Sequence, residues 1–324
     1  MSAGAVSTRI GGAEAVRVAR EALAGHRAWI VGGAVRNALL GAEVHDIDVA
    51  VEPGIEEGAA RALARAARGF AFPLSAEHAT WRAVAAEDAW HADVTALRAG
   101  SIEEDLRARD FTVNAVAVPL EGGEPLDPVG GAADAAARRL RAVSERIFGD
   151  DPLRLLRGPR LAARYDLELE RATADLARSA APHVAEAAGE RQFAELRAMV
   201  AGPDPLRALR LLDELGLTAV VLPEVEAMRG IAQTANHHLD VHAHTLAVLE
   251  HLLEIERGLP RFCGEAAGAM ASLLAEPLAD ELTRGEALRF GALLHDAGTP
   301  ATRGDAGGRV TFIGHDRVGA EVIA

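Results

Sequence analysis

The chain of 324 residues contains no lysine: all 34 of its basic residues are arginine. This absence excludes a Walker A lysine, the strand lysine of protein kinases and any enzyme that forms a Schiff base through lysine. A phosphate-binding site in this protein would therefore depend on arginine, backbone N–H groups and metal ions.

Cysteine and long apolar runs are also scarce. The single cysteine, Cys263, excludes an internal disulfide and fits the reducing conditions of the cytoplasm, where we expect the protein to act. No stretch approaches the ~18 consecutive apolar residues that a membrane helix needs, and residues 1–25 lack the apolar core of a signal peptide. We therefore expect no association with membranes.

The chain has fewer basic than acidic residues, but its basic residues are concentrated in one segment. The formal net charge of −14 argues against a protein that binds nucleic acid over its entire surface. Residues 138–164, however, hold eight arginines against three acidic residues. This local excess of arginine predicts a basic groove on an otherwise acidic molecule.

The sequence patterns predict two kinds of structure along the chain. Up to about residue 120, the segments AWIVGG, HDIDVAVE, WRAVAAE and AWHADVTAL predict strands, FTVNAVAVPL predicts a strand or the start of a helix, and AVRNALLG predicts a helix that Gly41 ends. Residues 1–24 predict one amphipathic helix. From residue 132 onward the pattern is almost entirely helical, with breaks at prolines. We therefore predict an α+β head with a small mixed sheet, followed by an all-α body.

A glycine pair and two aspartates carry the strongest chemical signal. Gly32 and Gly33 stand between a predicted strand and a predicted helix, where backbone N–H groups suit a triphosphate, and Arg36 lies in the first turn of that helix. Asp46 and Asp48 alternate in a strand and therefore project to one side. Two such carboxylates repel each other unless a cation lies between them, and hard oxygen ligands favour Mg²⁺. The combination indicates metal-dependent phosphoryl or nucleotidyl transfer.

Asp93, on another predicted strand, is a candidate third catalytic carboxylate; the alternative is a strand residue that faces solvent. Each of these motifs is weak when it stands alone. Their order and spacing together favour the functional interpretation.

These motifs resemble those of a known family. GGAVRNALLG followed by HDIDVAV is similar to the head domain of bacterial tRNA nucleotidyltransferases (CCA-adding enzymes) and bacterial poly(A) polymerases, of the DNA polymerase β superfamily. ARDFTVNAVAV and LDPVGGAADAAARRLRAV resemble two further family segments, although Ala108 replaces an arginine that is usual there. The resemblance implies that three residues line the sugar and phosphate pocket: Arg109, Asp110 and Asn114.

The segment FGDDPLRLLRGPRLAARY resembles the family's Glu-Asp-x-x-Arg motif, in which an aspartate and an arginine serve as a protein template for the base. A carboxylate that accepts from an amino group, beside a guanidinium that donates to a ring nitrogen, would admit cytosine and adenine and reject uracil and guanine. The alternative is a surface ion pair within one helix. The predicted nucleotide-binding residues here are Asp151, Arg154, Arg157 and Arg160. We interpret GERQFAELR, residues 189–197, as core packing.

The C-terminal third resembles HD-domain metal-dependent phosphohydrolases. HHLDVHAHTL, LLHDAGTP and FIGHDRVGA supply imidazoles and a carboxylate suited to a divalent metal, and the resemblance implies His244, His295 and Asp296 as ligands and His315 as a further one. The sequence ends before the downstream aspartate that such sites use, so a truncated domain is expected here. The alternative is an HD fold that is retained without activity.

The predicted domains are a nucleotidyltransferase head at 1–145, a helical neck and RNA-binding region at 146–228, and an HD-type helical domain at 229–324. The expected function is Mg²⁺-dependent addition of CMP and AMP, from CTP and ATP, to the 3′ end of tRNA. Shared motifs leave open a poly(A) polymerase and an enzyme that adds only CC or only A. Two alternatives from other classes are a metal phosphohydrolase with an RNA-binding head and an inactive fragment.

Overall fold

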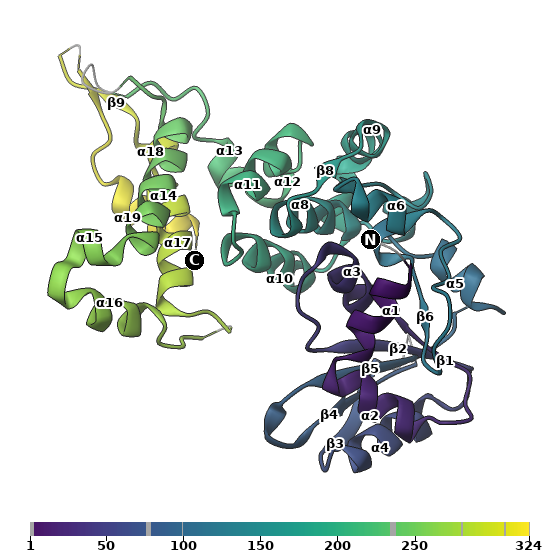
Figure 1. Ribbon diagram of the computed structural model, residues 1–324. Helices are drawn as coiled ribbons and strands as arrows, with labels where there is room; N and C mark the ends of the chain where they lie inside the picture. Colours follow the sequence, from purple (N-terminus) through teal and green to yellow (C-terminus); the bar gives the residue numbers. More distant parts are fainter. Residues whose placement is uncertain are drawn as a thin grey trace. The chain divides into compact units, whose positions relative to one another are not determined.

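The computed structural model describes residues 3–75, 79–98, 100–233, 238–279, 281–307 and 309–323. The chain forms two compact units, the first made of Met1–Asp150 with Leu167–Thr173 and the second of Asp151–Asp166 with Ala174–Ala324. Figure 1 shows the helices and strands of both units. Among the described residues, no helix is both long and apolar enough to cross a membrane.

The first unit is built on a six-stranded sheet with the order β3-β4-β5-β2-β1-β6. Strands β2 and β5 are parallel, whereas the other neighbouring pairs are antiparallel. The strands are β1 (Ala28–Val31), β2 (Ile47–Val51), β3 (Phe70–Ser75), β4 (Thr80–Val84), β5 (His91–Ala96) and β6 (Val118–Pro119). The mixed sheet confirms the predicted class of the head.

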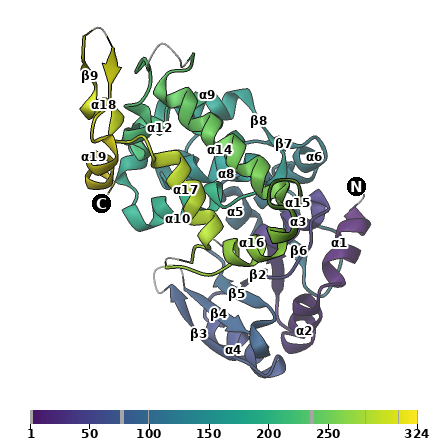
Figure 2. The same ribbon diagram turned by 90° about the vertical axis from the view of Figure 1, so that its left-hand side faces the viewer.

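One face of this sheet is covered by helices. Helix α4 (Glu56–Ala66) packs against β3, β4 and β5, and α2 (Glu14–Ala22) packs against α4 (Figure 2). Alternate strand residues such as Ile30, Val49 and Ala92 are fully buried in the core on this face. On the opposite face, Trp29, Val31 and Ala50 of β1 and β2 form a smaller core with Leu97, Ile102, Leu106, Ala115 and Ala117.

Local backbone chemistry explains the turns around β1. Gly32 follows β1 directly and has a φ of 63°, and α3 (Gly32–Leu40) ends at Gly41, which has a φ of 83°. Both angles lie in the left-handed region that favours glycine. The prediction that Gly41 ends this helix is confirmed.

Three details of the head differ from the sequence prediction. The single N-terminal helix is wrong, because two adjacent glycines, Gly11 and Gly12, separate α1 (Ala3–Gly11) from α2. FTVNAVAVPL forms a 3₁₀ turn (Thr112–Asn114) and then β6. Strand β3 was not predicted, because Pro73 interrupts its sequence pattern.

The remaining helices and strands of the first unit are short. They are α5 (Ile102–Arg107), α6 (Gly131–Ala136), β7 (Arg139–Leu140), α7 (Ile147–Asp150), β8 (Glu168–Leu169) and α9 (Arg171–Ala180), the last of which continues into the second unit.

The second unit is helical, as predicted for the body. Its longest helix, α14, begins after Asp240, whose side chain accepts from the N–H of Ala243 and so caps the helix. The described residues of this unit also form a small hairpin of two short strands. The elements are α8 (Arg154–Tyr165), α10 (Gly189–Val200), α11 (Pro205–Glu214), α12 (Thr218–Val221), α13 (Pro223–Glu226), α14 (Val241–Arg257), α15 (Leu259–Cys263), α16 (Ala267–Leu274), α17 (Arg284–Leu294), α18 (Thr299–Thr302), β9 (Gly304–Asp305), β10 (Val310–Thr311) and α19 (His315–Val322).

Candidate active site

The glycine turn after β1 lies against the carboxylate of Asp48. The N–H of Gly33 donates to Asp48 Oδ2 at 3.1 Å. A Cβ atom at position 32 would lie 2.6 Å from the same oxygen, which is closer than real Cβ contacts. Glycine is therefore required at position 32 for two reasons, its backbone conformation and the close approach of Asp48.

Asp48 is a partly buried acid surrounded by charged side chains. Burial raises the pKa of its carboxyl above the ordinary value; the N–H of Gly33 and the guanidinium of Arg109 oppose this shift, and the charge of Asp93 adds to it. The strand register places Asp48 opposite Asp93 on the neighbouring β5. A cation beside these carboxylates would therefore stabilise the charged form of Asp48.

The other two predicted catalytic carboxylates are already engaged by protein groups. Asp46 lies just before β2, and its Oδ1 accepts the N–H of His91 at 2.8 Å. Asp93 accepts two hydrogen bonds from Arg82, one from Nε and one from Nη2, each at 2.7 Å. These bonds raise the pKa of the Arg82 guanidinium. Asp46 and Asp48, as hard oxygen donors at a partly buried site, fit a divalent ion such as Mg²⁺.

Arg82 was not among the site residues predicted from the sequence. It faces Asp93 across the antiparallel pair of β4 and β5, and this relationship depends on the strand register. In the sequence, the only indication of a role for Arg82 was its position inside the predicted strand WRAVAAE.

The predicted sugar and phosphate residues gather beside the glycine turn. Arg36 donates from Nη1 to Asn114 Oδ1 at 2.9 Å, and Asn114 in turn donates from Nδ2 to Asp110 Oδ1 at 2.9 Å. The Arg36 Nη2 atom lies 3.5 Å from where a Cβ of Gly33 would be. A continuous chain of hydrogen bonds thus holds the Arg36 guanidinium next to the turn.

Arg109 brings a second guanidinium to the same place. Its Nη1 atom lies 3.2 Å from the position of a Cβ at Gly32. Asp105, which is buried and was not predicted, holds this side chain by accepting from Nη2 at 3.1 Å. Two arginine side chains therefore flank the glycine turn, and both are oriented by buried partners.

In the second unit, helix α10 holds the predicted base-reading residues of the segment around α8. Arg191 Nη2 donates to Asp151 Oδ2 at 3.2 Å. Glu195 forms ion pairs with both Arg157 and Arg160. Arg154, at the start of α8, is buried. The structure therefore orients this cluster by tertiary ion pairs.

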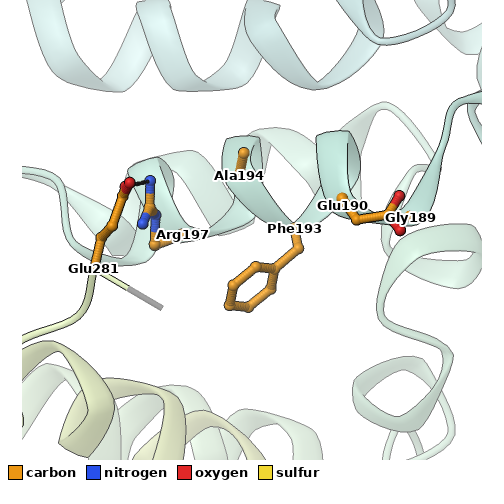
Figure 3. A pocket seen from close by; sticks show the side chains of 6 residues that line it. All are labelled: Gly189, Glu190, Phe193, Ala194, Arg197 and Glu281. Atoms are coloured by element: carbon orange, nitrogen blue, oxygen red, sulfur yellow. Dashed lines mark ion pairs between the residues drawn. The ribbon is translucent and has the colours of Figure 1, made fainter. Parts of the chain in front are cut away.

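The interpretation of the apolar residues of GERQFAELR as core packing is correct for Leu196 but wrong for Phe193, which is exposed. The polar residues Arg191 and Glu195 form the ion pairs just described. Figure 3 shows Phe193 and Arg197 of α10 at a pocket of ≈ 640 Å³, where Arg197 pairs with Glu281. None of the residues predicted as sites lines this pocket.

The histidines predicted as metal ligands meet around Asp296. His244, His295 and Asp296 offer ligand atoms that all lie within 4.8 Å of one another, and no other such group of three occurs among the described residues. His315 Nε2 lies 3.7 Å from Asp296 Oδ1.

Backbone carbonyl groups orient the imidazole rings of His295 and His315. The Nδ1 atoms of His295 and His315 each lie 2.9 Å from a backbone carbonyl oxygen, of Ala292 and Phe312 respectively. Such bonds fix the tautomer in metal sites and direct Nε2 toward the ion. The hydrogen bond to Asp296 raises the pKa of His295; burial alone would raise that of Asp296, but its bonds from His295 and Thr299 lower it.

Two family models match separate parts of the chain. The Poly A polymerase head domain matches residues 28–141, and the probable RNA and SrmB-binding site of polymerase A matches residues 166–229. The first match spans the glycine turn and all three head carboxylates.

Curated relatives match most of the chain. It is 40% identical over 302 residues to the A-adding tRNA nucleotidyltransferase of Deinococcus radiodurans, covering 91% of this chain and 62% of that one. It is 37% identical over 277 residues to the CC-adding tRNA nucleotidyltransferase of Geobacter sulfurreducens, covering 86% and 61%. The multifunctional CCA protein of Neisseria gonorrhoeae is 33% identical over 316 residues, covering 91% and 67%. The chain thus spans about 62% of the length of the first relative.

A solved structure has the same fold. The crystal structure of a tRNA nucleotidyltransferase complexed with a primer tRNA and an incoming ATP analog superimposes with a TM-score of 0.65 at 26% identity, covering 86% of this chain and 75% of that one.

Proposed function

Since the chain belongs to the family of bacterial tRNA nucleotidyltransferases and poly(A) polymerases, we propose that it adds CMP and AMP, from CTP and ATP, to the 3′ end of tRNA without a nucleic-acid template. The observation that carries this proposal is the meeting of the Gly32–Gly33 turn, two guanidinium groups and the partly buried carboxylate of Asp48.

The residues around the turn support binding of a triphosphate. Arg36 and Arg109 supply positive charge, and buried partners orient both side chains before any ligand arrives. Asp46 and Asp48 would hold Mg²⁺, which, when bound, promotes deprotonation of the RNA 3′-hydroxyl and offsets the charge that develops on the phosphate. The 3′-oxygen then bonds to the α-phosphorus, and the bond to pyrophosphate breaks.

The base is selected, in this proposal, by Asp151 and Arg154. The carboxylate accepts from the amino group of cytosine or adenine, and the guanidinium donates to the adjacent ring nitrogen. Arg157 and Arg160 support this cluster through Glu195.

The test is incubation of the protein with tRNA that lacks its 3′ CCA, in the presence of Mg²⁺ and of CTP, ATP or both. Addition of two C residues and then one A supports CCA addition. Addition of C alone, or of A only to tRNA ending in CC, identifies a partial enzyme like the two most similar relatives described above. Long A tails from ATP alone identify a poly(A) polymerase, and no incorporation contradicts the proposal.

A second activity is favoured by the convergence of His244, His295, Asp296 and His315. We propose that this cluster binds a divalent metal and forms an HD-type site. The site would hydrolyse phosphate esters. Phosphatase activity that survives Asp46→Ala but is lost in His295→Ala would support it. Absence of metal binding by the wild-type protein would leave the cluster as a structural one and contradict it.

A further inference from the structure

Three apolar side chains of β3 are exposed on the face of the sheet that carries the carboxylates. Phe70 is 61% exposed, Phe72 38% and Leu74 44%. Phe70 and Phe72 alternate along the strand, so they share one face, and their rings stack with centroids 6.0 Å apart. Leu74 follows them at the point where the pairing of β3 becomes irregular. Ala71, between the two rings, instead packs against the core on the opposite face. We refer to Phe70, Phe72 and Leu74 as the β3 strip.

The strand register connects the β3 strip to the carboxylates. Phe72 lies opposite Arg82 of β4, Arg82 lies opposite Asp93 of β5, and Asp93 lies opposite Asp48 of β2. Neighbouring strands are about 4.8 Å apart, so Phe72 is roughly 14 Å from Asp48 across one face of the sheet. One row of the sheet therefore presents an aromatic ring, a guanidinium and two carboxylates in that order.

The strip lies on the side of the carboxylates from which the RNA must approach. The glycine turn follows β1, and β1 and β5 flank β2 on opposite sides. In an in-line displacement, the attacking and leaving oxygens lie on opposite sides of the phosphorus. With the triphosphate at the glycine turn, an in-line attack would place the RNA end over β5 and β4, and the nucleotides before it would extend toward β3.

We propose that the β3 strip is a stacking platform for the unpaired bases at the 3′ end of the RNA, with Arg82 facing the RNA backbone. This inference rests on the proposed nucleotidyl transfer. Stacking of bases on aromatic rings tolerates any base, which suits an end whose last base changes with each addition. Arg82 places a positive charge between the platform and the carboxylates and thereby offsets their repulsion of the RNA phosphates.

A protein partner fits the strip less well. An edge strand can recruit a partner strand through its free backbone groups, but Pro73 lacks an N–H and the pairing of β3 is irregular between Pro73 and Ser75. The exposed rings also lie on the face of the sheet and not along its edge.

The first test compares Phe72→Leu, which keeps an apolar side chain but removes the ring, with Phe72→Tyr, which keeps the ring. The control is Phe262→Leu, since Phe262 of α15 is 50% exposed and belongs to the other unit. We expect Phe72→Leu to raise the KM for tRNA lacking CCA roughly five- to tenfold. The KM for CTP should stay unchanged. Phe72→Tyr should keep the wild-type KM for tRNA, and Phe262→Leu should not change it.

The second test detects stacking without catalysis. An RNA hairpin with 2-aminopurine as its last unpaired base is titrated with the full chain. Wild-type protein and Phe72→Tyr should quench the fluorescence, and the double variant Phe70→Ala/Phe72→Leu should not.

Equal KM values for the RNA in all variants, or equal quenching, would overturn the proposal. So would a loss of self-association in Phe72→Leu with an unchanged KM for RNA, because the strip would then be a protein interface. Absence of incorporation by the wild-type protein would count against the proposed transferase function instead, and the fluorescence titration would still decide the role of the strip.

Discussion

The Oδ2 atom of Asp48 lies 2.6 Å from the position that a Cβ atom on residue 32 would occupy. The glycine turn and the carboxylate of Asp48 are therefore packed as one unit, and the absence of a side chain on Gly32 leaves the space that Asp48 occupies. Substitution of this glycine tests that relationship.

We expect Gly32→Ala to lower incorporation at least a hundredfold while the protein still folds. The methyl group must displace Asp48, and the left-handed backbone costs about 1–2 kcal/mol of stability for a residue with a Cβ atom. The matched control is Gly58→Ala, because Gly58 lies in α4 with open space around its Cβ position. Incorporation assays and urea unfolding check this; full activity in Gly32→Ala would contradict it.

A second prediction concerns the raised pKa of Asp48. An acid whose folded pKa lies above its unfolded value of 3.8 destabilises the folded state as pH rises through the interval between the two values. Without metal, Asp48→Asn should therefore be more stable than wild type at pH 7, and the difference should shrink as the pH falls toward 4. Mg²⁺ should raise the melting temperature of wild type more than that of Asp48→Asn, which keeps the histidine cluster but lacks the Asp48 carboxylate. Thermal unfolding from pH 4 to 8, with and without Mg²⁺, measures both effects, and equal responses to Mg²⁺ would argue against Asp48 as a ligand.

The base-reading role of α8 predicts a change in selectivity. Arg154→Ala should reduce discrimination against UTP and GTP by roughly tenfold to a hundredfold, because one directional hydrogen-bonding partner is lost. The rate with CTP should fall less than this. Arg210→Ala, on the exposed side of α11, is the control. Single-nucleotide incorporation rates with all four triphosphates provide the measurement, and an equal loss with every one of them would contradict a template role.

The histidine cluster predicts metal binding that is independent of the head. His295→Ala should weaken binding of Mn²⁺ or Zn²⁺ to this cluster at least tenfold, since a ligand and its orienting bond to Ala292 are both removed. His251→Ala is the control, because His251 is exposed on α14 and pairs with Glu254. Calorimetric titration on the Asp46→Ala background isolates this site. The same affinity in His295→Ala and wild type would refute the assignment.

The sequence predicted those parts of the head that depend on local chemistry. Gly32, Gly41 and the strand position of Asp48 follow from turn geometry and strand periodicity, which act over a few residues. Asp46 was predicted within the same strand but lies just before it. The pairing of Arg82 with Asp93 depends on a strand register that no local pattern encodes. Strand β3 escaped prediction because Pro73 is unusual within strands, and an edge position is where proline is tolerated.

In the helical unit, too, the local pattern was predictable from the sequence and the long-range contacts were not. Helix periodicity predicted its class, whereas the contacts of Asp151 with Arg191 and of Arg157 with Glu195 join segments about 40 residues apart. Spacing along the chain cannot reveal which of many arginines meets which carboxylate. The histidine cluster was predicted because its motifs resemble those of HD-domain phosphohydrolases, in which imidazole and carboxylate side chains hold a metal.

The most direct test of the account measures transfer of radiolabelled CMP and AMP to tRNA lacking CCA by wild type and by Asp48→Ala. The account predicts Mg²⁺-dependent labelling by wild type and none above background by Asp48→Ala, with unchanged circular dichroism. Labelling by Asp48→Ala at the wild-type rate would show that the carboxylate beside the glycine turn does not carry the reaction.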